Sequence, residues 1–126
     1  MNSAKELPGG NVSRVWRIGD TIHREAGPWT PQVHRLLLRL RAKGIAFIPE
    51  PLGMDAEGRE MLTFLPGMVG STPLAEAQRS DGVIVRAASM LRAIHDATVD
   101  VATSWRTGWR APAREPVEVI CHGDFA

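Results

Sequence analysis

Cysteine, histidine and aspartate stand together in the stretch VICHGDFA, residues 119–126, behind a short apolar run. A Cys beside a His suggests a thiol nucleophile with its base, but neighbouring side chains on a strand point to opposite faces, so Cys121 and His122 cannot easily pair. We therefore interpret Cys121 as a small buried hydrophobic residue. Asp124 follows the predicted end of the strand and a flexible glycine, which is where a general base is displayed to a substrate.

A glycine turn near the beginning of the chain, LPGGN at residues 7–11, is a candidate phosphate site. Backbone N–H groups in such a turn can surround phosphate oxygens because no Cβ blocks the approach. The spacing matches neither G-x-G-x-x-G nor the P-loop, so a plain turn is the commoner interpretation. Arg24 lies on the second strand of a predicted hairpin and reaches this turn if the two strands pair. It would then hold a phosphate, whereas an exposed cation at a strand edge is the alternative.

The other histidines and two tryptophans carry weaker signals. His95 follows the apolar stripe of a predicted helix and is interpreted as a packing residue, while His23 and His34 are interpreted as surface or strand-face residues. No pair of histidines has the spacing of metal ligands, which argues against a zinc site. Trp105 and Trp109 can stack on a ligand, but anchoring a long loop to the body of the protein is the commoner role.

Composition and charge exclude several classes of function. The chain has 15 Lys and Arg against 14 Asp and Glu, with a formal net charge of +1 and no basic block, which argues against a nucleic-acid partner. One Cys rules out an internal disulfide and suits a reducing compartment. No apolar run approaches the ~18 residues of a membrane span, and the first residues lack the pattern of a secretory signal. The composition predicts a soluble, cytoplasmic protein with no membrane partner.

The elements that position the candidate residues follow from the hydrophobic periodicity. Alternating residues predict a hairpin that turns at Gly19-Asp20. A helix is predicted from Thr30 as N-cap, through Pro31, to a stop at Gly44. Two strands follow on either side of the turn residues 55–58. The buried face of the helix is predicted to hold Val33, Leu36, Leu37 and Leu40.

A second helix is predicted over residues 80–98, followed by a loop without a period over 99–116 and a strand from Val117. The apolar stripe of this helix is Val83, Ile84, Ala87, Leu91 and Ile94. The order of elements is hairpin, helix, two strands, linker, helix, long loop and strand, which indicates an α+β fold rather than a doubly wound sheet. The segment FLPGMVGSTP, residues 64–73, is the predicted boundary between two layers or lobes.

The pattern His-x-Asp at a strand end is also the form that can stand in place of the His-Arg-Asp of kinase catalytic loops. Together with LPGGNVSRVWRIGDTIHREAGPW, LLLRLRAKG, PEPLGMDAEGREMLTFLPG and LRAIHDAT, the closing VICHGDFA makes the sequence resemble the aminoglycoside phosphotransferase family. The resemblance implies a protein-kinase-like α+β fold, in which residues 1–67 form the nucleotide-binding N-terminal lobe, an antiparallel sheet with one helix. Residues 68–126 would then be the hinge and the truncated start of a mainly helical C-terminal lobe, ending in the catalytic loop.

The resemblance also implies roles for particular residues. Asp124 matches the catalytic base, in the motif that His122 opens. Arg24 stands where the family usually has a phosphate-pairing lysine, and the helix glutamate that pairs with that lysine is absent, since its neighbourhood reads Val33-His34-Arg35. The residues that match the loop over the nucleotide phosphates are Gly9, Gly10, Asn11 and Ser13, and those that match the hinge against the adenine are Phe64, Leu65 and Gly67.

A fragment of an ATP-dependent phosphotransferase, which transfers the γ-phosphate to a hydroxyl of a small molecule, is the function that the resemblance implies. ATP and Mg²⁺ are then expected for the full-length enzyme, with the nucleotide and the hydroxyl compound as partners. Both metal-binding positions of the family would follow Ala126, so no metal ligand is expected within this chain, and the 126-residue chain alone is predicted to be inactive.

A non-catalytic α+β remnant or binding module without the metal site is the alternative. If the chain is a fragment, the apolar stripe of helix 80–98 lacks part of its cover, which predicts self-association through this helix. The acceptor does not follow from the resemblance, because members of the family modify aminoglycosides, choline-like alcohols and sugars.

Overall fold

The computed structural model describes residues 3–8, 13–70 and 73–121, which form parts of two compact units. The first unit takes the chain up to residue 65 together with residues 107–112, and the second takes residues 66–106 and those from 113 onward. The division lies at residue 65, close to the predicted end of the first lobe at 67, and residues 107–112 return to the first unit.

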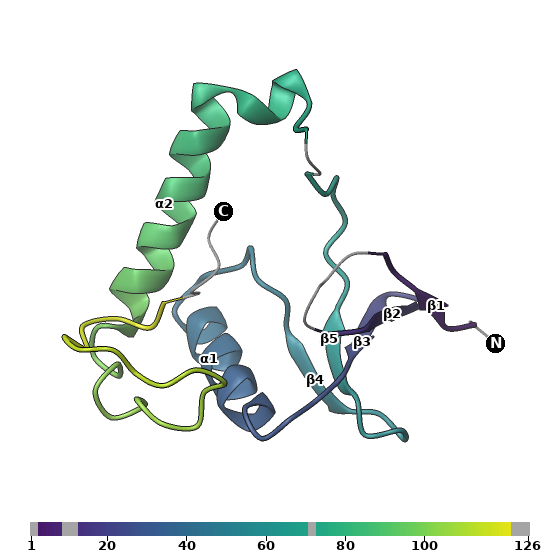
Figure 1. The fold of residues 1–126 in the computed structure, drawn as a ribbon, viewed down its shortest axis with the longest axis horizontal. Coiled ribbons are helices and arrows are strands. Elements are labelled where there is room, and N and C mark those ends of the chain that lie inside the picture. The colour runs from purple at the N-terminus through teal and green to yellow at the C-terminus, as the bar shows by residue number, and fades with distance from the viewer. Residues whose placement is uncertain (1–2, 9–12, 71–72, 122–126) are drawn as a thin grey trace. The chain divides into compact units, whose positions relative to one another are not determined.

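The described part of the first unit is built on one antiparallel sheet of five strands, in the order β1-β2-β3-β5-β4 (Figure 1). The strands are β1 Lys5–Glu6, β2 Val15–Ile18, β3 Thr21–Arg24, β4 Pro51–Met54 and β5 Glu60–Thr63. The hairpin of β2 and β3 turns at Gly19, where a φ of 61° suits glycine, so the predicted hairpin is confirmed. Strand β3 lies between β2 and β5, so its side chains have neighbours on both sides.

The register of β2, β3 and β5 sorts their side chains onto two faces. His23 and Arg24 follow one another on β3, so they point to opposite faces. Residues directly opposite on paired strands share a face. One face therefore carries Val15, Ile22, Arg24, Glu60 and Leu62, and the other carries Trp16, Thr21, His23, Met61 and Thr63.

Helix α1, Thr30–Ala42, lies beside β4 in the first unit (Figure 1). Thr30 is the first helical residue rather than the cap, and its hydroxyl accepts a hydrogen bond of 3.0 Å from the Gly27 N–H. Pro31 stands in the first turn and Gly44, at a φ of 86°, follows the helix end, as predicted. Of the predicted apolar face, Leu40 is buried, at 2% exposed, whereas Val33, Leu36 and Leu37 are half-buried. Ile48 and Leu62 are also buried.

The two edges of the sheet are short or irregular. Strand β1 has two residues. Strand β4 begins at Pro51, and its pairing with β5 shifts register between Pro51 and Gly53, where φ is 102°. Leu52 and Met54 on the same strand are exposed.

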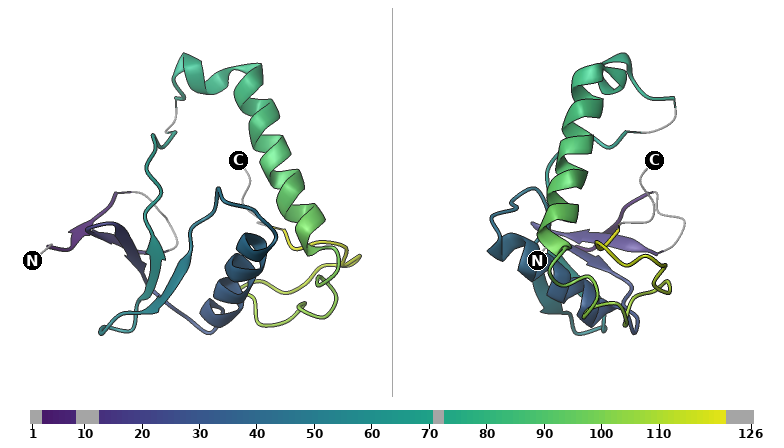
Figure 2. Two further views of the ribbon diagram at one scale, coloured as in Figure 1. Left: turned by 180° about the vertical axis from the view of Figure 1, so that it is seen from behind. Right: turned by 90° about the vertical axis from the view of Figure 1, so that its left-hand side faces the viewer.

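The second unit contains the 3₁₀ helix η1, Glu76–Arg79, which leads directly into helix α2, Asp81–Thr98 (Figure 2). The Ser80 hydroxyl accepts a hydrogen bond of 3.3 Å from the Val83 N–H, so α2 starts where the sequence predicts it. Most of the predicted stripe is half-buried, but Ile84 is 60% exposed. No helix in the described part of the chain is long and apolar enough to cross a membrane.

The segment after the long loop differs from the prediction. Residues 117–121 form no strand, because the Ile120 N–H donates to the hydroxyl of the fully buried Thr98 at 3.0 Å rather than to a sheet. Thr98 in turn donates to the His95 carbonyl at 3.1 Å, so this contact ties the segment to the end of α2. Cys121 is exposed, so its interpretation as a buried residue is wrong. No strand pairing involves Cys121 in the described part of the chain.

Candidate functional site

A hollow of about 280 Å³ opens on the face of the sheet that carries Arg24. Its apolar floor is formed by β2, β3 and β5, and Arg24 supplies its one cationic side chain. The volume is close to the lower limit of roughly 300 Å³ for small-molecule pockets, which is enough for one flat ring system. The residues that line the hollow are Val15, Ile22, Arg24, Pro49, Leu62, Thr63, Phe64 and Leu65.

Arg24 is held by a carboxylate from the neighbouring strand. Its Nε donates to Glu60 Oε1, across the pair that β3 and β5 form at these residues. The other oxygen, Oε2, accepts from His34 Nε2 on helix α1 at 2.7 Å. Glu60 is 4% exposed, His34 16% and Arg24 36%. We call Arg24, Glu60 and His34 the hollow-side cluster; its carboxylate comes from the strand, and the helix contributes a histidine.

The chain leaves β5 beside the hollow with Phe64 fixed on two sides. The Phe64 N–H donates to the Asp20 carbonyl at 2.9 Å, so this donor is used within the sheet. The Arg17 guanidinium lies 3.7 Å from the centroid of the Phe64 ring, and its Nε donates to the Gly19 carbonyl at 2.9 Å. These contacts hold Phe64 against the turn between β2 and β3.

Three of the predicted site residues therefore lie together at the hollow, namely Arg24, Phe64 and Leu65. Ser13 is described and half-buried but does not line the hollow, and the exposed Gly67 belongs to the second unit. The other predicted site residues lie outside the described part of the chain: Gly9, Gly10, Asn11, His122 and Asp124.

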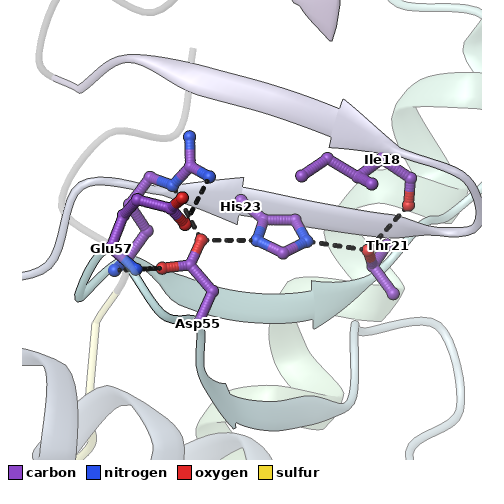
Figure 3. A network of polar contacts seen from close by, with 6 residues as sticks. Ile18, Thr21, His23, Asp55 and Glu57 are labelled. Carbon is purple, nitrogen blue, oxygen red and sulfur yellow. Dashed lines mark hydrogen bonds and ion pairs between the residues drawn. The ribbon is translucent and has the colours of Figure 1, made fainter. Parts of the chain in front are cut away.

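The opposite face of the sheet holds a second polar network, centred on His23 and Asp55 (Figure 3). His23 Nδ1 and Asp55 Oδ2 are 2.7 Å apart, and both side chains are 7% exposed. Arg59 Nε donates to the same oxygen at 2.7 Å, and the Arg59 guanidinium lies 4.7 Å from the centroid of the Trp16 ring. We call His23, Asp55 and Arg59 the turn cluster. His23 lies on a strand face, which is one of the two predicted positions, but it is buried there against Asp55. His34 lies on helix α1 and is largely covered, so its interpretation as a surface or strand-face residue is wrong.

Asp55 remains ionised in this environment. Burial by itself would raise its pKa, but hydrogen bonds from the Arg59 backbone N–H, the His23 ring, the Arg59 side chain and the Glu57 backbone N–H more than offset burial. Together they hold the pKa of Asp55 far below its usual range. The two backbone bonds, of 2.8 Å from Arg59 and 2.9 Å from Glu57, also fix the turn between β4 and β5.

Both ring nitrogens of His23 have polar partners. The Thr21 hydroxyl, which donates to the Ile18 carbonyl at 2.8 Å, lies 2.9 Å from His23 Nε2. The ionised Asp55 accepts from Nδ1. Thr21, His23 and Asp55 have the order of a nucleophile, base and acid. The Thr21 hydroxyl donates to the Ile18 carbonyl, however, so we interpret the turn cluster as stabilising the fold rather than as catalytic.

Comparisons with known proteins identify the family. The model of the phosphotransferase enzyme family, APH, matches residues 3–118. The chain belongs to the phosphotransferase enzyme family. The hollow and the hollow-side cluster thus lie within the matched part of the chain, whereas the match ends before His122 and Asp124. The resemblance seen in the sequence is confirmed.

Two individual proteins resemble this chain. The trifolitoxin immunity protein of Rhizobium leguminosarum bv. trifolii is 36% identical over 113 residues, which cover 87% of this chain and 41% of that protein. A choline/ethanolamine kinase family protein from Mesorhizobium loti has a similar structure, with a TM-score of 0.51 and 22% identity over 88% of this chain and 42% of that one. The chain spans about two fifths of the length of these relatives. The structural match confirms the α+β, kinase-like fold.

Glu60, which binds the lining residue Arg24, is the residue that the sequence interpretation missed. One signal was present: Glu60 is two positions before Leu62 on the same strand, so both side chains point to the buried face. A carboxylate on a buried face requires partners. Strand parity could therefore have shown that Glu60 needed a cation, although it could not have identified Arg24 and His34.

Proposed function

We propose that this chain carries the nucleotide-binding part of an ATP-dependent phosphotransferase that transfers the γ-phosphate to a hydroxyl of a small molecule. The observation that carries the proposal is the hollow, which is open and mostly apolar and has one cation, Arg24, in its lining. The adenine would lie in the apolar part, against Ile22 and Leu62. The Arg24 guanidinium would donate to phosphate oxygens, for which its planar set of N–H groups is well suited.

The backbone next to the hollow supports the hinge assignment of Phe64, Leu65 and Gly67. The Phe64 N–H is used by the Asp20 carbonyl, which leaves Leu65 as the backbone donor of this segment that lines the hollow. An adenine edge would accept from the Leu65 N–H, while the Phe64 ring supplies an apolar wall. Gly67 would allow the chain to turn away from the nucleotide.

The remaining roles rest on family membership and on the sequence motifs. Backbone N–H groups of the loop Gly9, Gly10, Asn11 and Ser13 would cover the phosphates. Asp124, in the motif opened by His122, would accept the proton of the attacking hydroxyl as that oxygen bonds to the γ-phosphorus and ADP leaves. A protein that carries this sequence is therefore expected to lose phosphate transfer when Asp124 is replaced by Asn.

Mg²⁺ supplies charge neutralisation on the phosphates in enzymes of this kind. No group of three or more ligating side chains occurs among the residues that the structure describes, so we assign the ion no residue here. The residues that we propose to act on the phosphates and the acceptor are Arg24 and Asp124.

ATP titration followed by backbone amide NMR tests the proposal. We expect shifts at Val15, Ile22 and Leu62 and a dissociation constant near 1 mM, about −4 kcal/mol, because the open hollow offers a single cation. Arg24→Ala should weaken binding at least fivefold. Arg86→Ala, which removes an exposed charge on α2, should leave it unchanged. ATP binding that is insensitive to Arg24→Ala would contradict the proposal.

A second candidate is immunity to a toxin, which the name of the Rhizobium relative states for that protein. This candidate is compatible with the non-catalytic alternative, in which the domain acts as a binding module. Expression in a toxin-sensitive strain, followed by a challenge with trifolitoxin, tests it. Protection that survives Asp124→Asn favours a binding module, whereas protection that this change abolishes favours phosphate transfer.

Two further properties stay predictions. A cytoplasmic location is expected from the composition. Self-association through helix 80–98 is expected from its apolar residues, of which Ile84 and Val85 are 60% and 63% exposed. Sedimentation of the chain at increasing concentration tests the second.

A further inference from the structure

Glu60 is a buried carboxylate whose two oxygens have different partners. Oε1 accepts from Arg24 on β3 and Oε2 accepts from His34 on α1, and the side chain is 4% exposed. Two donors from two elements restrict the rotation of the carboxylate, because a turn that improves one bond breaks the other. The cation that Glu60 holds is the most exposed member of the cluster, at 36%. Glu60 thus provides a fixed hydrogen-bond acceptor for the Arg24 Nε–H.

We propose that Glu60 is the positioning residue of Arg24 and sets which edge of the guanidinium faces the hollow. This inference rests on the proposed function, in which Arg24 contacts the nucleotide phosphates. The Arg24 Nε–H donates to Glu60, so this edge is occupied. A guanidinium has five N–H groups in a rigid plane. With the Nε edge held by the protein, N–H groups of the terminal nitrogens remain for a phosphate.

His34 completes the arrangement from the helix. The Glu60 carboxylate can only accept, so His34 Nε2 carries a proton and donates across 2.7 Å. This bond links α1 to β5 and keeps Glu60 Oε2 occupied. Because the His34 contact needs only a donor at this point, Gln is expected to replace it. The identity of the residue at 60 should therefore matter more for phosphate binding than the identity of the residue at 34.

A purely structural role for Glu60 makes a different prediction. If Glu60 only stabilised the sheet, its loss would weaken the binding of every ligand in the hollow to a similar degree. A positioning role affects the phosphate end alone. Adenosine, which fills the apolar part without phosphates, and ATP therefore distinguish the two roles.

The experiment measures the affinity of the chain for ATP and for adenosine by NMR titration, together with the Arg24 Nε–H resonance. Glu60→Gln should weaken ATP binding about tenfold and adenosine binding less than twofold. It should also shift the Arg24 Nε–H resonance and speed its exchange with water. Glu57→Gln, a matched change of an exposed carboxylate on the opposite network, should alter none of these values.

A relocated carboxylate provides the rescue. The double variant His34→Glu/Glu60→Gln moves the acid from the strand to the helix, across a contact of 2.7 Å, and should restore most of the ATP affinity and of the Arg24 Nε–H signal. His34→Gln alone should change ATP affinity less than twofold. The double variant also contains a single carboxylate at the site, so it remains informative if Glu60→Gln folds poorly.

The outcomes separate this inference from the proposed function. If the unchanged chain binds no ATP, the proposed function fails, while the Nε–H resonance still reports whether Glu60 orients Arg24. If ATP binds but Glu60→Gln weakens ATP and adenosine equally, or leaves the Arg24 resonance unchanged, the positioning role is refuted.

Discussion

The two faces of one sheet carry clusters made of the same three residue types. The hollow-side cluster joins His34, Glu60 and Arg24, and the turn cluster joins His23, Asp55 and Arg59. In both, a carboxylate no more than 7% exposed lies between a histidine and an arginine. The clusters differ in how the carboxylate is bound and in how much of the arginine remains accessible.

Asp55 also accepts from two backbone N–H groups of its own turn, and its arginine is 18% exposed and lies over Trp16. Glu60 is bound by side chains from β3 and α1, and its arginine is 36% exposed at the rim of the hollow. The same chemistry thus stabilises a turn when the cation is covered. In the proposed function, it prepares a binding group when the cation is left partly open. Exposure of the arginine, rather than the residue types, would then separate the two roles.

Removing the carboxylate of the turn cluster should have the largest effect. Asp55→Asn leaves His23 and Arg59 without their shared counter-charge, so we expect a loss of about 3–5 kcal/mol in the free energy of unfolding, measured with urea. Asp96→Asn is the control, because Asp96 is 62% exposed in its pair with Arg92 and should contribute no more than about 1 kcal/mol. Equal losses for the two variants would contradict the structural role of the turn cluster.

Lowering the pH should remove part of the same stabilisation. The pKa of Asp55 is lower in the folded chain than the unfolded value of about 3.9, so its contribution is fully present above that value. It decreases as the pH falls below about 4 towards the folded pKa. We therefore expect the difference in unfolding free energy between the unchanged chain and Asp55→Asn to narrow from pH 5 to pH 2.5. A constant difference in unfolding free energy over this pH range would contradict a lowered pKa of Asp55 in the folded chain.

The two arginines should separate stability from binding. Arg59→Ala removes a covered ion pair and a ring contact, and we expect a loss of about 2 kcal/mol in unfolding free energy with ATP affinity unchanged. Arg24→Ala should cost about 1 kcal/mol or less, because Arg24 is partly solvated and Glu60 keeps His34. It should nevertheless weaken ATP binding. Matched effects of the two variants in both assays would refute the distinction between the clusters.

The smallest effect concerns the Thr21 hydroxyl beside His23. Thr21→Val removes the hydrogen-bond partner of His23 Nε2 and the donor to the Ile18 carbonyl, at about 1–2 kcal/mol in the free energy of unfolding. Thr21→Ser retains both hydrogen bonds and should lie within about 0.5 kcal/mol of the unchanged chain. Urea unfolding of both variants measures this difference. A loss for Thr21→Ser as large as that for Thr21→Val would contradict the role of the hydroxyl.

Local patterns were sufficient for the elements that hold the site. The turn at Gly19, the end of α1 before Gly44 and the start of α2 after Ser80 all follow from the backbone preferences of single residues. Alternation along the strands indicated the hairpin. The hollow was anticipated only through three residues: Arg24, to which both the predicted hairpin and the family resemblance pointed, and Phe64 and Leu65, to which the resemblance alone pointed.

The partners within the clusters could not be predicted in this way. His23 meets Asp55 across 32 positions of sequence, and His34 meets Glu60 across 26. These contacts depend on strand register and on the placement of α1, which a pattern of neighbouring residues does not contain. Asp55 was interpreted as a turn residue. It does occupy a turn, but its carboxylate also anchors the strand behind it.

The outermost strands of the sheet bear on how this protein meets other chains. An exposed strand edge is a template on which a second molecule can extend the hydrogen-bonded ladder and begin a fibre. Strand β1 is too short to offer more than a few such groups, and on β4 the proline and the bulge interrupt the row of donors. Growth of the sheet from molecule to molecule is therefore blocked at both ends. The irregularities at Pro51 and Gly53 disfavour such pairing, and we expect a straightened, proline-free β4 to be the first place for aggregation to start.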